Sequence, residues 1–168
     1  MNSEELKALQ APIKAGYKDN PQSALVTMSV TGTVNGQDLT CSVPTQAGTA
    51  VAGLHPAAGG DGTHACSGDM LLESLVACVG VTLRAVATAM DIPITGGSIQ
   101  AEGTMDFRGT LGVSRDVPIG MSIVQLTFDL DSPAPAEQVA KLVELTERYC
   151  VIYQTLQKPP QLESHLRQ

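Results

Sequence analysis

The sequence predicts an α+β fold in which an antiparallel sheet packs with two main helices. Three patterns predict this fold. Residues 67–90 repeat apolar side chains at the i, i+3, i+4 and i+7 positions of one helical face. Residues 24–34 alternate apolar and polar side chains, and residues 124–130 repeat apolar side chains at every second position, as strands do. Helical spacing returns after residue 135, so the chain order is helix, hairpin, long helix, strands and helix.

Composition excludes several classes of protein. The 168 residues can bury one core, and we expect a helical arm over residues 1–18 and a single domain over residues 19–168. A net charge of −7, 3% aromatic residues and no Trp argue against nucleic acid or a membrane surface as a partner. The first ten residues contain acidic side chains and no apolar signal segment, so we expect a cytoplasmic protein with reduced thiols.

The first predicted element is a short helix over residues 2–10. Asn2 and Glu5 have the spacing of a capping box, in which each side chain bonds to the other residue's backbone N–H. Pro12 is expected to end the helix, because proline has no N–H to donate.

A hairpin is predicted next. Residues 24–34 alternate and contain many β-branched side chains, which is typical of a strand. Asn35-Gly36 is the strongest short signal for a type I′ turn, and residues 37–43 are expected to return as the partner strand.

The segment from residue 46 to residue 62 is rich in Gly and Ala and is expected to form a flexible loop. It leads His64 and Cys66 to the start of the central helix. A His and a Cys two residues apart are a weak zinc signal that matches no common finger, so a loop histidine and an incidental thiol are the default interpretation. We expect no metal site.

The central helix follows. Ser67 or Asp69 can cap its N-terminus, and Pro93 ends it. Small and apolar residues on its other faces predict burial nearly all round. Glu73 and Arg84 interrupt the apolar run, which argues against a membrane span.

Strands are predicted over residues 98–107 and 119–130, with a loop over residues 108–118. A final helix is expected after residues 132–135, and Cys150 lies where that helix ends or kinks.

Cys78 and Cys150 are the residues most able to carry chemistry. Cys78 lies on a stripe of small side chains in the central helix, where a free cysteine is most often a packing residue. Two main helices on one sheet usually pack together, however, and would then bring both thiols close. A thiol pair of this kind can reduce a peroxide through a sulfenic acid and a disulfide. Redox chemistry and two separate core cysteines both remain open at this point.

Two segments resemble the OsmC/Ohr family of osmotically induced and organic-hydroperoxide-resistance proteins. Residues 68–78 (GDMLLESLVAC) are similar to its first cysteine motif, and residues 147–156 (ERYCVIYQTL) to its second. The resemblance implies an intertwined homodimer and a cofactor-free thiol peroxidase. It implies that Cys78 reacts with an organic hydroperoxide, Cys150 resolves the product, and a thiol reductant resets the disulfide. The apolar stripe around Cys78 suits an alkyl or lipid-like hydroperoxide.

The sequence departs from the family pattern at three places. Gly68 stands where the family has its catalytic glutamate, residues 20–45 contain no arginine to activate the thiolate, and Val151 replaces the proline after the second cysteine. Activation would then come from another side chain or from the partner chain. The candidate activating or pocket residues are Asp69, His64, Cys66, Arg84 and Arg148.

Three hypotheses therefore follow from the sequence. The first is a dimeric peroxidase that acts on organic hydroperoxides. The second is a non-catalytic binding protein of the same fold that holds a small hydrophobic ligand. The third is a metal or thiol sensor built on His64, Cys66 and Cys78.

Overall fold

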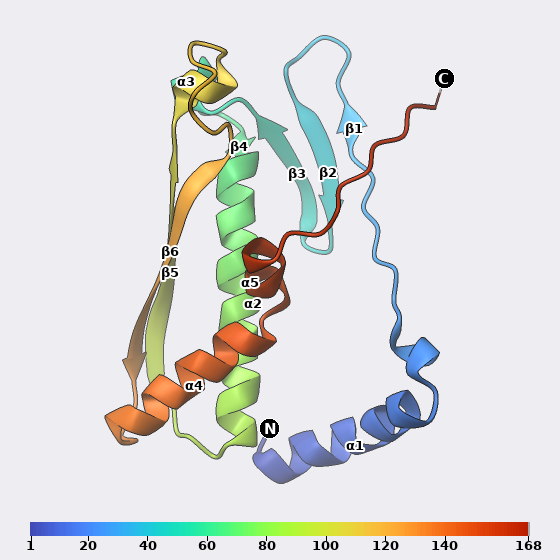
Figure 1. Ribbon diagram of the computed structural model, residues 1–168, viewed down its shortest axis with the longest axis vertical. Coiled ribbons are helices and arrows are strands. Elements are labelled where there is room, and N and C mark those ends of the chain that lie inside the picture. Colours follow the sequence, from blue (N-terminus) through green and yellow to red (C-terminus); the bar gives the residue numbers. More distant parts are fainter. Residues whose placement is uncertain (168) are drawn as a thin grey trace. The chain divides into compact units, whose positions relative to one another are not determined.

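The structure, a computed structural model, describes residues 1–167 (Figure 1). Its α+β class confirms the sequence prediction. The chain forms two compact units, which are described separately. Unit 1 contains Met1–Leu9, Ser74–Ile99 and the chain from Phe128 onward, and unit 2 contains Gln10–Glu73 and Gln100–Thr127. The elements in order are α1 (Ser3–Asp19), β1 (Thr33–Val34), β2 (Cys41–Thr45), β3 (Gly48–Gly53), β4 (Ala65–Cys66), α2 (Ser67–Ala89), β5 (Gly96–Met105), α3 (Phe107–Thr110), β6 (Met121–Asp131), α4 (Ala136–Tyr149) and α5 (Val151–Gln157), with short 3₁₀ helices at Pro21–Ala24 and Pro56–Ala58.

Helix α1 is longer than predicted. Its capping box is confirmed, because Asn2 Oδ1 accepts from the Glu5 N–H and Glu5 Oε2 accepts from the Asn2 N–H, both at 2.9 Å. The prediction that Pro12 ends the helix was wrong, since α1 continues through Pro12 to Asp19. Pro12 removes one backbone donor but leaves the bonds of the flanking turns in place, so the helix tolerates it at a cost in stability.

The predicted strand over residues 24–34 is mostly absent. Only Thr33–Val34 pairs, and the chain before it has no regular structure after the 3₁₀ helix. The side chains of Val26, Met28 and Val30 are each about 70% or more exposed. The prediction was wrong because a strand needs a neighbour, and none of the described residues of this chain pairs with residues 25–32.

The hairpin turn also differs from the prediction. Val34 pairs with Cys41, and the Asn35 N–H donates to the Thr40 carbonyl at 3.2 Å. The loop therefore spans residues 35–40, and the expected two-residue turn at Asn35-Gly36 was wrong. The returning strand begins at Cys41 instead of Gln37, because the polar residues 35–40 supply the connection.

Unit 2 carries a four-stranded sheet in the order β1-β2-β3-β4. β2 and β3 pair antiparallel from Cys41↔Ala52 to Thr45↔Gly48, around a turn at residues 46–47. β3 occupies part of the segment expected to be a flexible loop, so that prediction was wrong. β4 pairs parallel with β3 and leads directly into α2, which confirms that this segment delivers Cys66 to the helix start.

Helix α2 is confirmed nearly residue for residue. It ends in a Schellman motif, in which Asp91 takes the left-handed conformation (φ 54°) and the N–H groups of Ile92 and Asp91 donate to the carbonyls of Ala87 and Thr88. By length and composition α2 could cross a membrane. Its exposed side is nevertheless interrupted by Glu73 and Arg84, both exposed.

The burial of α2 is one-sided, which corrects the expectation of burial nearly all round. Leu75, Val79, Leu83 and Ala87 form a stripe at three- and four-residue spacing and are at most 3% exposed. Val81, by contrast, is 73% exposed.

The core of unit 1 joins α2 to α4 and to the adjacent ends of β5 and β6. Leu142 of α4 is fully buried against Leu83, Ala87 and Ile92. Burying a leucine of this kind contributes about 1.5–3 kcal/mol. The core therefore fixes α4 on α2, and with it the position of Cys150 at the end of α4.

Candidate functional site

Two thiols meet in unit 1. Cys78 lies in the middle of α2, and Cys150 is the residue between α4 and α5. Cys150 ends α4 with φ −74° and ψ 115°, a backbone conformation that breaks the helix and lets α5 start in a new direction. Both thiols are free, and their sulfur atoms are in hydrogen-bonding contact. The fold thus brings together residues that are 72 positions apart in the sequence.

The surroundings of Cys78 favour its thiolate. Burial alone raises the pKa of a thiol, but hydrogen bonds to the sulfur from the Ile152 N–H, the Cys150 thiol, the Val151 N–H and the Thr82 hydroxyl outweigh it. The pKa of Cys78 is therefore lowered from the ordinary cysteine value. The side chain is only partly buried, so a small reactant can reach the sulfur.

Cys150 has the opposite character. It is 0% exposed, and burial is the main cause that raises its pKa. Its interaction with Cys78 raises the pKa further, although the Tyr153 N–H donates to its sulfur at 3.5 Å. Cys150 is thus a buried, protonated thiol whose S–H group donates a hydrogen bond to the sulfur of the more accessible and more acidic Cys78.

Thr82 is placed to act on Cys78 because it lies one helical turn further along α2. Three other threonines in helices, Thr88, Thr146 and Thr155, donate their hydroxyls back to the carbonyl four residues earlier. The Thr82 hydroxyl bonds to the Cys78 sulfur. Helical spacing alone puts Thr82 one turn from Cys78, but nothing in the sequence assigns it a role.

The backbone of α5 supplies the donors that the sequence could not reveal. Val151 and Ile152 begin α5, and their N–H groups have no earlier carbonyl in the helix to bond to. Both donate to Cys78. The residue after the second cysteine is proline in the family pattern, and proline has no N–H. Val151 therefore adds a donor that the usual residue cannot provide.

The two arginines considered as activators, Arg84 and Arg148, make contacts with other groups. Arg84 donates from Nη1 to the Ile94 carbonyl at 2.9 Å. Arg148 is exposed and lies over the Tyr149 ring, with Cζ 5.6 Å from its centroid. The groups that act on Cys78 include neither arginine.

The other candidates belong to unit 2. His64 is exposed and its Nδ1 lies 2.9 Å from the Thr63 hydroxyl. Cys66 is partly buried in β4, and Asp69 is exposed in the first turn of α2. Within residues 1–167, no group of three or more His, Cys, Asp or Glu side chains is arranged to hold a metal ion.

Comparisons with known proteins agree with this geometry. Residues 60–165, which contain both thiols, match the model of the family described as OsmC-like protein. A search of curated proteins finds no match.

Solved structures show the same fold. An OsmC-like protein from Mycoplasma pneumoniae superposes with a TM-score of 0.67 at 18% identity, covering 80% of this chain and 89% of that one. An organic hydroperoxide resistance protein from Elizabethkingia anophelis gives a TM-score of 0.63 at 14% identity, covering 80% and 91%. One from Legionella pneumophila gives 0.62 at 16% identity, covering 80% and 93%. At these identities the likeness is one of fold.

Proposed function

The chain belongs to the OsmC-like protein family, and from this premise we propose that it is a thiol-dependent peroxidase for organic hydroperoxides. Cys78 is the peroxidatic thiol and Cys150 the resolving thiol. One observation carries the proposal. The accessible Cys78 has a lowered pKa and contacts a second thiol, Cys150, that is fully buried.

The reaction starts at the Cys78 thiolate. The thiolate attacks the terminal oxygen of the hydroperoxide, the O–O bond breaks, and the alkoxide takes a proton and leaves as an alcohol. Cys78 becomes a sulfenic acid. The Cys150 sulfur then attacks the Cys78 sulfur, a disulfide forms, and the hydroxyl group leaves with the Cys150 proton as water. A dithiol reductant gives two electrons and two protons to restore both thiols.

The asymmetry between the thiols supports these roles. A thiolate is the nucleophile, so the residue with the lowered pKa reacts first. Cys150 is closed to solvent and stays protonated, which protects it from peroxide until Cys78 has been oxidised. The early part of the chain lacks the arginine that stabilises the thiolate in the family pattern. Hydrogen bonds from Val151, Ile152 and Thr82 stabilise the Cys78 thiolate instead.

The exposed apolar surfaces support a homodimer as part of this proposal. Residues 25–32 extend without a partner, and α2 carries the exposed Val81 close to Cys78. A second copy can cover surfaces of this kind, and a copy that packs on α2 beside Cys78 can complete a pocket for the apolar part of a hydroperoxide. Cytoplasmic residence belongs to the same proposal, because the mechanism needs reduced thiols.

A coupled peroxide-consumption assay tests the function. With dithiothreitol as reductant, the wild type is expected to consume cumene hydroperoxide catalytically, and Cys78→Ser to be inactive. Cys41→Ser is the matched control and should keep the wild-type rate, since Cys41 lies in β2 of unit 2.

The absence of a charged activating side chain at Cys78 favours one competing function, a binding protein for a small hydrophobic ligand. Equal, background-level consumption by the wild type and Cys78→Ser would favour that function and overturn the peroxidase proposal.

A further inference from the structure

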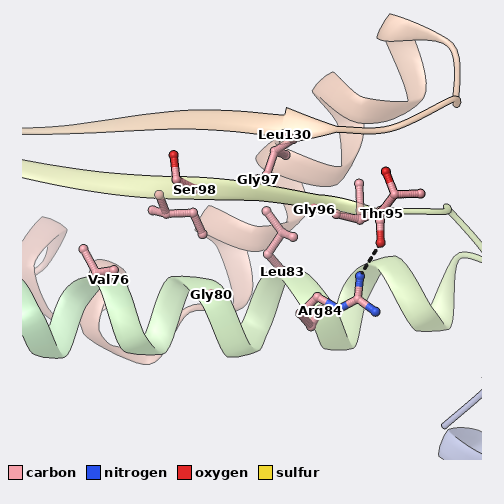
Figure 2. Close-up of a pocket in the computed structure, with 11 residues that line it drawn as sticks. Val76, Gly80, Leu83, Arg84, Thr95, Gly96, Gly97, Ser98 and Leu130 are labelled. Carbon is pink, nitrogen blue, oxygen red and sulfur yellow. Dashed lines mark hydrogen bonds between the residues drawn. The ribbon is translucent and has the colours of Figure 1, made fainter.

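A cleft of about 470 Å³ lies between α2 and the start of β5, within unit 1 (Figure 2). Val76, Gly80 and Leu83 line it from α2, and Gly96, Gly97 and Leu130 from the strands. Cys78 lies two residues from both Val76 and Gly80, which places it about 200° around the helix, on the opposite side. The cleft is therefore separate from the thiol site.

Glycines keep the cleft open. A Cβ built at Gly80 would make an ordinary van der Waals contact with Ile99 Cδ1 at 3.8 Å, and both residues line the cleft, so a larger side chain at residue 80 would take up cleft volume. Gly97 has φ +132°, and a Cβ there would lie 2.2 Å from the Asp129 carbonyl oxygen, so no side chain fits. The volume is within the range of pockets that bind small organic molecules.

Arg84 is the one charged side chain that lines the cleft. Its Nη1 donates to the Ile94 carbonyl, and Figure 2 shows this bond holding the guanidinium at the edge of the cleft. Arg84 forms no ion pair within residues 1–167. A guanidinium has five N–H donors, so most of its donors keep no protein partner. An apolar wall with a fixed, unpaired cation at one end matches an amphipathic anion.

A smaller cavity of about 260 Å³ reaches Arg84 and Ile94 as well. Ser3, in the first turn of α1, lines it, is 5% exposed, and has a hydroxyl with no hydrogen-bond partner among the described residues. That hydroxyl adds a donor at the Arg84 end. Asp91 also lines this cavity and disfavours a second negative charge there. The head group that fits is therefore monovalent.

We propose that the cleft binds a small amphipathic monocarboxylate, with its apolar chain between α2 and β5 and its carboxylate at Arg84. This site is additional to the thiol site and does not depend on peroxidase activity.

Calorimetric titration with sodium decanoate, kept below its micelle concentration, tests the proposal on the full chain. We expect one saturable site per chain, and decanol, which has no charge, to bind at least about tenfold more weakly. Arg84→Gln should weaken decanoate by about tenfold or more and leave decanol unchanged. Arg115→Gln, at an exposed arginine of unit 2, should bind as the wild type does.

A second variant tests where the apolar tail of the ligand binds. Gly80→Leu should fill the cleft and abolish binding of both molecules, whereas Gly16→Leu adds the same side chain in α1 where a Cβ has open space. Cys78→Ser should bind decanoate normally. The proposal is overturned if decanoate does not bind to the wild type, or if Arg84→Gln binds it as the wild type does. It is also overturned if Gly80→Leu changes the oligomeric state but leaves ligand binding unchanged. Arg84 is exposed, so Arg84→Gln decides the result even if Gly80→Leu fails to fold.

Discussion

Replacing Thr82 with valine removes one donor from the Cys78 sulfur while keeping a branched side chain at the same position on α2. The hydroxyl stabilises the thiolate more than the neutral thiol, because the sulfur of a neutral thiol is only a weak acceptor. Its loss therefore raises the pKa of Cys78. A single hydrogen bond contributes about 1 kcal/mol net, which corresponds to about fivefold less thiolate at a pH below the pKa.

The effect on the reaction rate is smaller than the loss of thiolate. A thiolate of higher pKa is intrinsically more nucleophilic, with a Brønsted coefficient of about 0.5, so the rate near neutral pH falls by about twofold. The pH midpoint of the reaction moves upward. A lower rate near neutral pH together with a higher pH midpoint is expected only if the hydroxyl acts on the thiolate.

The assay is the rate of iodoacetamide alkylation at Cys78, followed by peptide mass spectrometry across a pH series that brackets the ordinary thiol pKa. Thr88→Val is the matched control, because its hydroxyl donates to the Arg84 carbonyl and does not touch Cys78. An unchanged or lower pH midpoint in Thr82→Val, with Thr88→Val at the wild-type value, would refute the reasoning.

The remaining predictions concern stability and assembly. Leu142→Ala should lower the free energy of unfolding by about 2–5 kcal/mol in urea titrations, because Leu142 is fully buried in the core, whereas the exposed Leu111→Ala should leave it nearly unchanged; equal losses would contradict this. Asp91→Gly should raise the thermal midpoint, because Asp91 has φ 54° and glycine adopts this conformation with a conformational free energy that is lower by up to about 1 kcal/mol. A lower midpoint would show that contacts of the aspartate side chain contribute more to stability. Met28→Ser combined with Val30→Ser should shift sedimentation toward the monomer, because both side chains are exposed in a segment without a partner; an unchanged distribution would rule this segment out of the interface.

The two main helices, α2 and α4, were predictable from the sequence because each pattern depends on local contacts. The apolar repeat of α2, its end at Asp91 and the break at Cys150 all follow from spacing and capping within a few residues. Strand pairing was not predictable in the same way. Residues 24–34 have strand alternation, yet only Thr33–Val34 pairs, because pairing depends on a distant neighbour.

The candidate site was predictable in its side chains but not in its backbone. Cys78 and Cys150 stand out as thiols on two helices that pack together, and the structure brings them into contact. The N–H groups of Val151 and Ile152 have no sequence signature, because every residue except proline has one. Only the start of α5 beside α2 makes them donors to Cys78.

The central claim is that Cys78 and Cys150 form a peroxidatic and resolving pair. Its most direct test is intact mass with peptide mapping after one equivalent of cumene hydroperoxide is added to the reduced protein. The account predicts rapid formation of a Cys78–Cys150 disulfide, with Cys41 and Cys66 still reduced. Thiols that stay unchanged, or a Cys78 sulfinic acid formed while Cys150 stays reduced, would contradict it.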